Sequence, residues 1–209
     1  TLKGLGYRHG LIEPPHHVIV KAPVFSFEKL QQVDISLGPE MKSTGEVLGI
    51  DRSFADALYK SMLAGGFSFP QSGNILVSVA EKDKAELIPL LMKAHDFGFH
   101  LFATEGTAAS LRDAGATRVE TVRKVGEGLP NVLDFIREGK IDLAVNTPTY
   151  GKNITSTGYQ VRRACVEYKI PCLTSTDTTA AFFDVLVRKA QNSLQPAVVS
   201  LQEYLQPTE

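Results

Sequence analysis

From residue 74 onward, short apolar runs alternate with stretches of helical periodicity, and this alternation limits the possible folds more than any other feature. The apolar runs are continuous rather than alternately apolar and polar, which is typical of parallel strands buried on both faces. The sequence therefore predicts an α/β fold, with a parallel Rossmann-like sheet and helices on both faces. The predicted strands are residues 75–79, 99–103, 118–122, 141–145 and 172–174, with Val198 and Val199 as a candidate edge strand.

Helices are predicted between these strands. They cover residues 84–97, 107–114, 130–138, 157–168 and 177–190, with a last short helix at 201–205. Pro89 would cost about 3 kcal/mol in a helix interior, so its helix is expected to start late or to kink there. Asp177 is the predicted N-cap of the last long helix.

The first third of the chain has a different pattern. Residues 1–45 contain a β-branched run at 18–22 but no strand–helix–strand unit, and residues 52–65 have the periodicity of a helix. We therefore expect three parts: a small β and irregular fragment of another domain (1–50), a linking helix and linker (51–73) and the α/β domain (74–209). Because the chain starts at Thr1, it is expected to be a piece of something longer.

Composition excludes several classes of partner. The net charge of −1 provides no general attraction to nucleic acid or to an anionic membrane, and no apolar run approaches the roughly 20 residues of a membrane span. His16 and His17 have no Cys or carboxylate at metal-site spacing, so no metal site is predicted. Cys165 and Cys172 are not a CxxC pair and are expected to be free thiols in a reducing cytoplasm.

Polar residues follow each predicted strand, at the edge where open parallel sheets bind ligands. Residues 104–107 (TEGT) lie between a strand and a helix, where backbone N–H groups and the helix dipole favour an anion such as phosphate. Gly106 is expected to let the backbone approach closely or take a positive φ. The other strands are followed by Lys84, Lys124, Asn146 and Thr174 with their polar neighbours, so a phosphorylated or carboxylated small molecule is the expected ligand.

This predicted site lacks the groups that catalysis requires. There is no Walker A motif, since Gly151-Lys152 lacks the flanking residues, and no GxGxxG motif. The histidines all precede the turn at 104–107 and none is in a loop of this edge, namely His9, His16, His17, His95 and His100. Without a base, nucleophile or metal set, the arrangement indicates a binding site rather than a catalytic one.

Several segments resemble a known family. Residues 37–49 (LGPEMKSTGEVLG) resemble the end of the second ATP-grasp unit of the carbamoyl-phosphate synthetase large subunit. Residues 76–84 (LVSVAEKDK), 98–108 (GFHLFATEGTA), 139–148 (GKIDLAVNTP) and 161–174 (VRRACVEYKIPCLT) resemble its C-terminal allosteric domain, which has the methylglyoxal-synthase-like fold. The Lys124 loop with GEGLPN also matches. The resemblance covers nearly the whole chain.

The resemblance implies a five-stranded parallel sheet and an effector pocket that takes nucleotides such as UMP or IMP. The residues it implies are Lys84, Thr104, Gly106, Thr107, Lys124, Asn146 and Thr147, with Thr174 as a candidate second contact. Pro148 replaces a hydroxyl residue of many members, and the loop at 148–157 is longer. The segment Cys172-Leu173-Thr174 is less polar than ornithine binding would need, which argues against ornithine control. Arg162 and Arg163 match a family pair, for which surface ion pairing is the favoured role and a pocket-facing position of one of them is the alternative.

Two main functions follow, and both stay open at this stage. The favoured one is a regulatory, non-catalytic module whose partners would be the rest of the synthetase large chain, the glutaminase small subunit and a small effector, with a homo-oligomer as a further option. The fragment itself would need no cofactor, whereas the parent ligase would use ATP with Mg or Mn. The alternative is a methylglyoxal synthase acting on dihydroxyacetone phosphate, but Leu129 stands where that family needs a catalytic Asp. A third candidate is the related IMP cyclohydrolase domain, but that domain has no segment that corresponds to residues 37–49.

Overall fold

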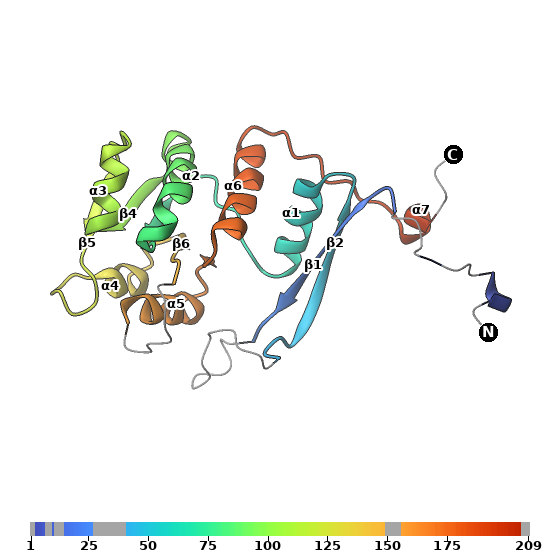
Figure 1. Cartoon of the computed structure of the whole chain (residues 1–209), viewed down its shortest axis with the longest axis horizontal. Helices are drawn as coiled ribbons and strands as arrows, with labels where there is room; N and C mark the ends of the chain where they lie inside the picture. Colours follow the sequence, from blue (N-terminus) through green and yellow to red (C-terminus); the bar gives the residue numbers. More distant parts are fainter. Residues whose placement is uncertain (1–2, 7–9, 11–14, 27–40, 149–155, 206–209) are drawn as a thin grey trace.

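A five-stranded parallel sheet forms the centre of the computed structural model, which describes residues 3–6, 10, 15–26, 41–148 and 156–205. Its spatial order is β5-β4-β3-β6-β7, and every neighbouring pair runs parallel (Figure 1). The predicted sheet is therefore confirmed. The strands are β3 (Asn74–Val77), β4 (His100–Thr104), β5 (Val119–Val122), β6 (Leu143–Val145) and β7 (Cys172–Leu173).

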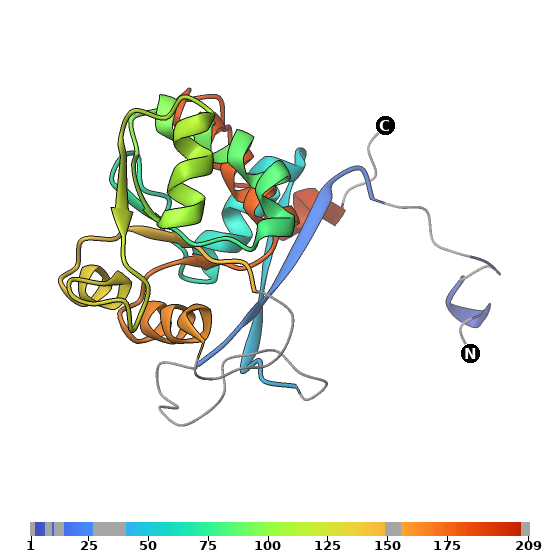
Figure 2. The same ribbon diagram turned by 60° about the vertical axis from the view of Figure 1, so that its left-hand side comes forward.

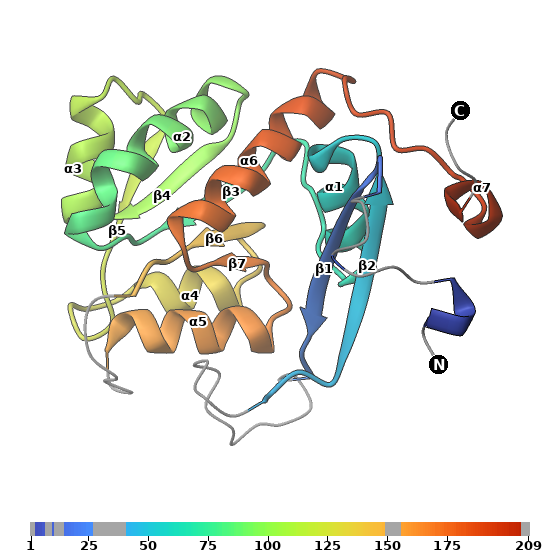
Figure 3. The same cartoon turned by 45° about the vertical axis from the view of Figure 1, so that its right-hand side comes forward.

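Helices cover both faces of this sheet, as predicted (Figure 3). The chain builds outward from β3 to β4 and β5, and then returns to add β6 and β7 on the other side of β3. The order thus reverses between β3 and β6, which is where open α/β sheets bind ligands. One face carries α2 (Lys84–Asp96), α3 (Glu105–Asp113) and α6 (Thr176–Ala190), and the other carries α4 (Val132–Arg137) and α5 (Thr157–Glu167).

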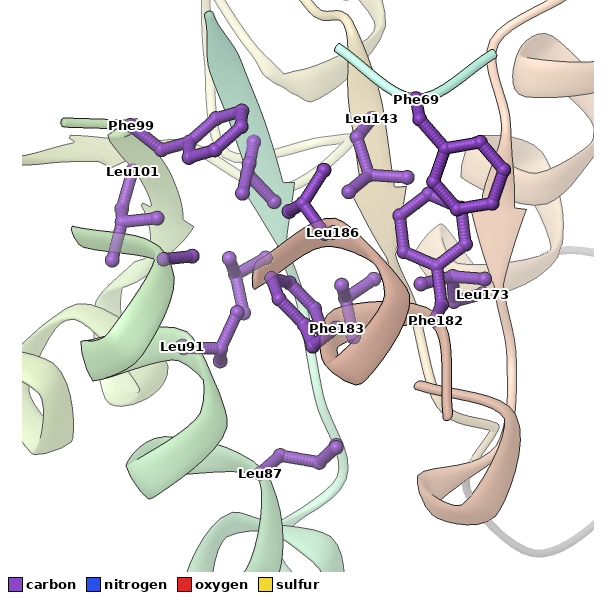
Figure 4. Close-up of a cluster of buried hydrophobic side chains, with 14 of the residues drawn as sticks. Phe69, Leu87, Leu91, Phe99, Leu101, Leu143, Leu173, Phe182, Phe183 and Leu186 are labelled. Carbon is purple, nitrogen blue, oxygen red and sulfur yellow. The ribbon is translucent and has the colours of Figure 1, made fainter. Parts of the chain in front are cut away.

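The core consists of two clusters, one on each face of the sheet. Ile75 and Val77 of β3 belong to the cluster under α2, α3 and α6, whereas Leu76 belongs to the cluster under α4 and α5. Figure 4 shows part of the first cluster, where the Phe69 ring stacks on the Phe182 ring with centroids 4.6 Å apart. These buried side chains fix the strand register and hold the strand ends in place.

One alternative for the helix with Pro89 and one predicted N-cap are wrong. α2 begins at Lys84 and contains Pro89, which excludes the alternative of a late start. Both Pro89 and Ala85, whose carbonyl loses a hydrogen bond, are exposed, so water can solvate that carbonyl. The N-cap of α6 is Ser175, whose hydroxyl accepts from the Thr178 N–H at 3.3 Å, and Asp177 lies in the first turn instead.

The two cysteines are free, as predicted. Cys165 on α5 is buried, and Cys172 on β7 is partly buried. The neighbouring Cys172 thiol and burial together raise the pKa of Cys165, so this group stays a neutral thiol that packs as a small apolar side chain.

The N-terminal unit is the antiparallel pair β1 (Val18–Val24) and β2 (Gly45–Asp51) with α1 (Phe54–Ala64) packed on it. A short helical turn, Lys3–Leu5, precedes it. The α1 helix begins at the N-cap Ser53, whose hydroxyl accepts from the Asp56 N–H. It also packs against α6, and its residues join the same core cluster as the main sheet. The N-terminal unit and the sheet domain are therefore in direct apolar contact.

The candidate edge strand at Val198 and Val199 is wrong, because this segment leaves the sheet domain. Residues 194–205, which we call the C-terminal strap, run from α6 to the N-terminal unit and end in α7 (Leu201–Leu205), as Figure 2 shows. The Gln195 N–H donates to Asp56 Oδ1 at 2.9 Å, and the Tyr204 hydroxyl donates to the Ile50 carbonyl at 2.9 Å.

A buried ion pair holds the middle of the strap. Asp51 is 3% exposed, and its carboxylate lies 2.8 Å from the Lys60 Nζ. The Ala197 N–H donates to Asp51, while Lys60 donates to the Ala197 carbonyl. Burial alone would raise the pKa of Asp51, but the hydrogen bond from Lys60 and those from backbone N–H groups lower it below its usual value. Likewise, burial would lower the pKa of Lys60, but Asp51 raises it above the usual value.

We expect Asp51→Asn to lower the free energy of unfolding at pH 7 by about 2–3 kcal/mol, because Lys60 loses its buried counter-charge. A lowered carboxyl pKa stabilises the fold above about pH 4, and this contribution is lost as the pH falls through the lowered value. The raised pKa of Lys60 contributes stability below about pH 10, and this contribution is lost as the pH rises through the raised value. The free energies of unfolding of the two proteins, measured by urea titration from pH 3 to pH 8, should therefore approach each other toward the acidic end.

The control is Glu46→Gln, which breaks the exposed ion pair with Lys21 and should cost under about 1 kcal/mol. An equal cost for both variants would contradict this account.

Candidate functional site

The carboxyl ends of all five parallel strands lie at one edge of the sheet, which we call the carboxyl rim. The rim consists of residues 78–84 after β3, 104–107 after β4, 123–124 after β5, 146–148 after β6 and 174–175 after β7. Every residue of the predicted effector site therefore belongs to the rim. Tyr150 and Lys152, which also follow β6 in the sequence, lie outside the described residues.

The helix α3 begins at the rim, and it begins earlier than predicted. Its first residue is Glu105 and its N-cap is Thr104, so Gly106 lies in the first helical turn and does not take a positive φ. Thr104 and Thr107 are both buried, with their hydroxyl oxygens 3.5 Å apart, and Thr104 makes no side-chain cap to the helix. The first N–H groups of α3 are thus left without a side-chain cap at the rim, which is the arrangement that binds anions.

Lys84 is held beside this helix start. Its side chain is only 15% exposed, and Nζ donates to the Gly106 carbonyl at 2.8 Å. The same Nζ lies 2.6 Å from a carboxylate oxygen of Glu81. A Cβ at position 106 would lie 3.6 Å from Nζ, an ordinary van der Waals distance, so the ammonium group lies directly beside this first turn of α3. The structure therefore brings Lys84, Gly106 and the two threonines together.

Asn146 and Thr147 lie in the crevice between β3 and β6, where the strand order reverses. Both are buried, and both bind the backbone that follows β3. Thr147 Oγ1 accepts from the Ala80 N–H at 2.9 Å, and Asn146 Nδ2 donates to the Ser78 carbonyl at 3.0 Å. Among the described residues, one donor and one acceptor of the Asn146 amide are engaged, which leaves one of each without a partner there.

Arg162 on α5 reaches the rim residue Asn146, a role that the sequence analysis ranked below surface ion pairing. Its Nη1 donates to Asn146 Oδ1 at 2.5 Å, whereas Arg163 pairs with Glu167 on the helix surface at 2.7 Å. A Cβ at Gly158 would lie 3.1 Å from the guanidinium, so the glycine gives the Arg162 side chain room beside the helix. The signal in the sequence was the spacing of Gly158 and Arg162, one helical turn apart just after the polar loop.

Lys124 and Thr174 lie on the flanks of the rim, because β5 and β7 are the edge strands. Lys124 is half-exposed, and its Nζ lies 3.9 Å from a carboxylate oxygen of Glu127. Thr174 is exposed at the end of β7. The structure therefore separates these two residues from the central group around Lys84 and Asn146, so they are candidates for the ends of an elongated ligand.

His17, His95 and His100 have partners away from the rim. His95 Nε2 accepts from the Thr117 N–H at 3.1 Å, the His100 ring stacks on Phe102, and the His17 ring lies 5.1 Å from that of Tyr204. His9 lies outside the described residues. In the described ranges, no group of three or more His, Cys, Asp or Glu side chains is arranged for a metal ion. No helix there is both long and apolar enough to cross a membrane.

The sheet order and the rim define an α/β domain with a candidate anion site, and residues 86–174 match the family described as the MGS-like domain. This match covers 89 of the 209 residues. Over 179 residues, or 84% of the chain, the sequence is 49% identical to a protein of Methanopyrus kandleri strain AV19 named carbamoyl phosphate synthase large chain, C-terminal section. The chain is thus a relative of that section, and it spans about a third (33%) of the relative's length.

Similarity to solved structures is weaker. A methylglyoxal synthase from Elizabethkingia anophelis NUHP1 matches 68% of this chain and 95% of its own, with a TM-score of 0.46 and 17% identity. The structure of ForH matches 64% of this chain and 87% of its own, with a TM-score of 0.38 and 20% identity. Similarity at this level says nothing about activity.

Proposed function

We propose that the chain is a regulatory section of a carbamoyl-phosphate synthetase large chain, and that its rim binds a phosphorylated nucleotide such as UMP or IMP. The observation that carries this proposal is the start of α3, where uncapped N–H groups, two buried threonines and the ammonium group of Lys84 meet. A phosphate dianion accepts hydrogen bonds from all three kinds of donor. The relationship to the large-chain section supports the regulatory role.

The phosphate would bind at the start of α3, with Lys84, Thr104, Gly106 and Thr107 around it. Asn146 and Thr147 follow β6, which is two strands from β4 with β3 between them, and the sugar or base of a nucleotide could reach them there. Lys124 would add charge on the β5 flank. In this proposal, Arg162 fixes the orientation of the Asn146 amide.

The rest of the proposal concerns the longer protein. Residues 1–50 would be the tail of an ATP-grasp unit, 51–73 a linking segment and 74–209 the effector domain. The complete enzyme would make carbamoyl phosphate from bicarbonate, ATP and ammonia or glutamine, with a glutaminase small subunit as partner and Mg or Mn with the ATP. The contact of α1 with α6 and the C-terminal strap give two physical connections through which an effector could act on that body.

The alternative, a methylglyoxal synthase, has less support. That reaction needs a catalytic carboxylate, and Leu129 occupies its place in the loop after β5. His17, His95 and His100 also have partners elsewhere. Turnover of dihydroxyacetone phosphate by this chain would reverse the ranking.

The test uses the complete synthetase. In a Thr104→Ala/Lys124→Ala double variant, the rate of carbamoyl phosphate synthesis should no longer respond to UMP or IMP. The control is Lys140→Ala, an exposed lysine between α4 and β6, which should keep the response. An undiminished response in the double variant would show that the effector binds elsewhere.

A further inference from the structure

The Lys84 ammonium group already has an anionic partner, and the two partners differ sharply in exposure. Lys84 is 15% exposed and is fixed by the Gly106 carbonyl, whereas the Glu81 side chain is 87% exposed. The backbone beneath Glu81 is anchored, because the Ala80 N–H donates to Thr147 and the Asp83 N–H donates to the Ala80 carbonyl. Only the Glu81 side chain is therefore free to leave, while the lysine stays in position.

A tethered carboxylate of this kind competes with any ligand that needs the same ammonium group. Glu81 lies three residues before Lys84, so its effective concentration at Nζ is high and does not depend on the solution. An incoming anion must either displace the carboxylate or bind beside it against charge repulsion. Both routes lower the affinity of the rim for anions.

Glu127 provides a contrast on the flank. Its carboxylate lies 3.9 Å from the Lys124 Nζ, but it also accepts from the Lys124 backbone N–H at 2.9 Å. This second bond ties the carboxylate to the loop backbone, and Lys124 is half-exposed in any case. Glu81, with no such backbone bond among the described contacts, is the better competitor.

We infer that Glu81 is an internal competitor for the anion site, a carboxylate that occupies Lys84 in the free protein and sets how tightly a phosphorylated effector binds. This inference rests on the proposed function and adds a residue that tunes it. An exposed ion pair has a formation constant of roughly 1.4–5, so its removal should strengthen effector binding by about two- to sixfold.

Calorimetric titration of the 209-residue chain with UMP and IMP tests this inference. Glu81→Gln should lower Kd by about two- to sixfold, with no change in the thermal midpoint large enough to indicate misfolding. The matched control is Glu86→Gln, which removes the same charge from an exposed site in the first turn of α2. It should change Kd by less than about 1.5-fold, because screening weakens charges that make no contact.

A second variant pair identifies Lys84 as the group for which Glu81 competes. In a Lys84→Met background, Glu81→Gln should give less than about half of its wild-type gain on a logarithmic scale, because the two residues interact. If the wild type binds and Glu81→Gln binds equally or more weakly, the inference is wrong but the proposed function stands. If neither the wild type nor Glu81→Gln binds UMP or IMP at millimolar concentrations, the proposed function fails and the inference fails with it.

Discussion

Replacing Lys84 with alanine is expected to weaken the binding of UMP or IMP by at least about thirtyfold. The Nζ is largely buried at the start of α3, so its charge acts on a phosphate with little screening from water. Truncating one partner of a desolvated, hydrogen-bonded charge pair costs about 2–5 kcal/mol, which corresponds to this loss or more. The measurement is the calorimetric Kd of the variant against that of the wild type.

The control for this prediction is Lys93→Ala. Lys93 lies on the same helix but in its last turn, is exposed and is distant from the rim. It changes the net charge by the same amount, so it should alter Kd by less than about twofold. Equal losses in both variants would mean that general charge, rather than the position of Lys84, controls binding.

The second large effect concerns Gly49, where β2 passes directly under α1. A Cβ at this position would lie 2.0 Å from the Ala57 carbonyl oxygen and 2.6 Å from the Ser61 nitrogen. Both are backbone atoms of a helix, so no side-chain movement relieves the overlap. Gly49→Ala should lower the free energy of unfolding by about 3–4 kcal/mol, at the upper end for overpacking, as measured by urea denaturation.

The same strand contains the matched control. Gly45 has no atom within 4 Å of where a Cβ would lie, and its φ is not positive. Gly45→Ala should therefore change stability by less than about 1 kcal/mol. If Gly49→Ala were as mild as this control, α1 could not be packed on β2 as the structure has it.

The sheet and the rim could be predicted from sequence because both depend on local pattern. Continuous apolar runs such as 99–103 identify buried parallel strands, and parallel strands bring their following loops to one edge. The order of the strands, with β5 and β7 at the edges, is a matter of tertiary packing. For that reason the sequence did not indicate that Lys124 and Thr174 would lie on the flanks.

The features that sequence analysis missed depend on contacts between distant residues or on small geometric differences. The strap is held by Asp51, which is 146 residues from Ala197, and no local pattern marks such a bond. Adjacent residues of a helix point about 100° apart, so packing decides that Arg162 and not Arg163 turns to the rim. The helix α3 starts at Glu105 despite the weak helix propensity of Gly106, because Thr104 already has the extended backbone of an N-cap.

The central claim is that the rim recognises the phosphate of a nucleotide, and its most direct test compares ligands with and without that group. Calorimetric titration of the 209-residue chain with UMP and IMP should give micromolar binding of at least one of them. The matching nucleoside, uridine or inosine, should bind at least about tenfold more weakly, because it lacks the group that α3 and Lys84 would hold. Equal affinity for nucleotide and nucleoside, or no binding of either nucleotide at millimolar concentrations, would contradict the account.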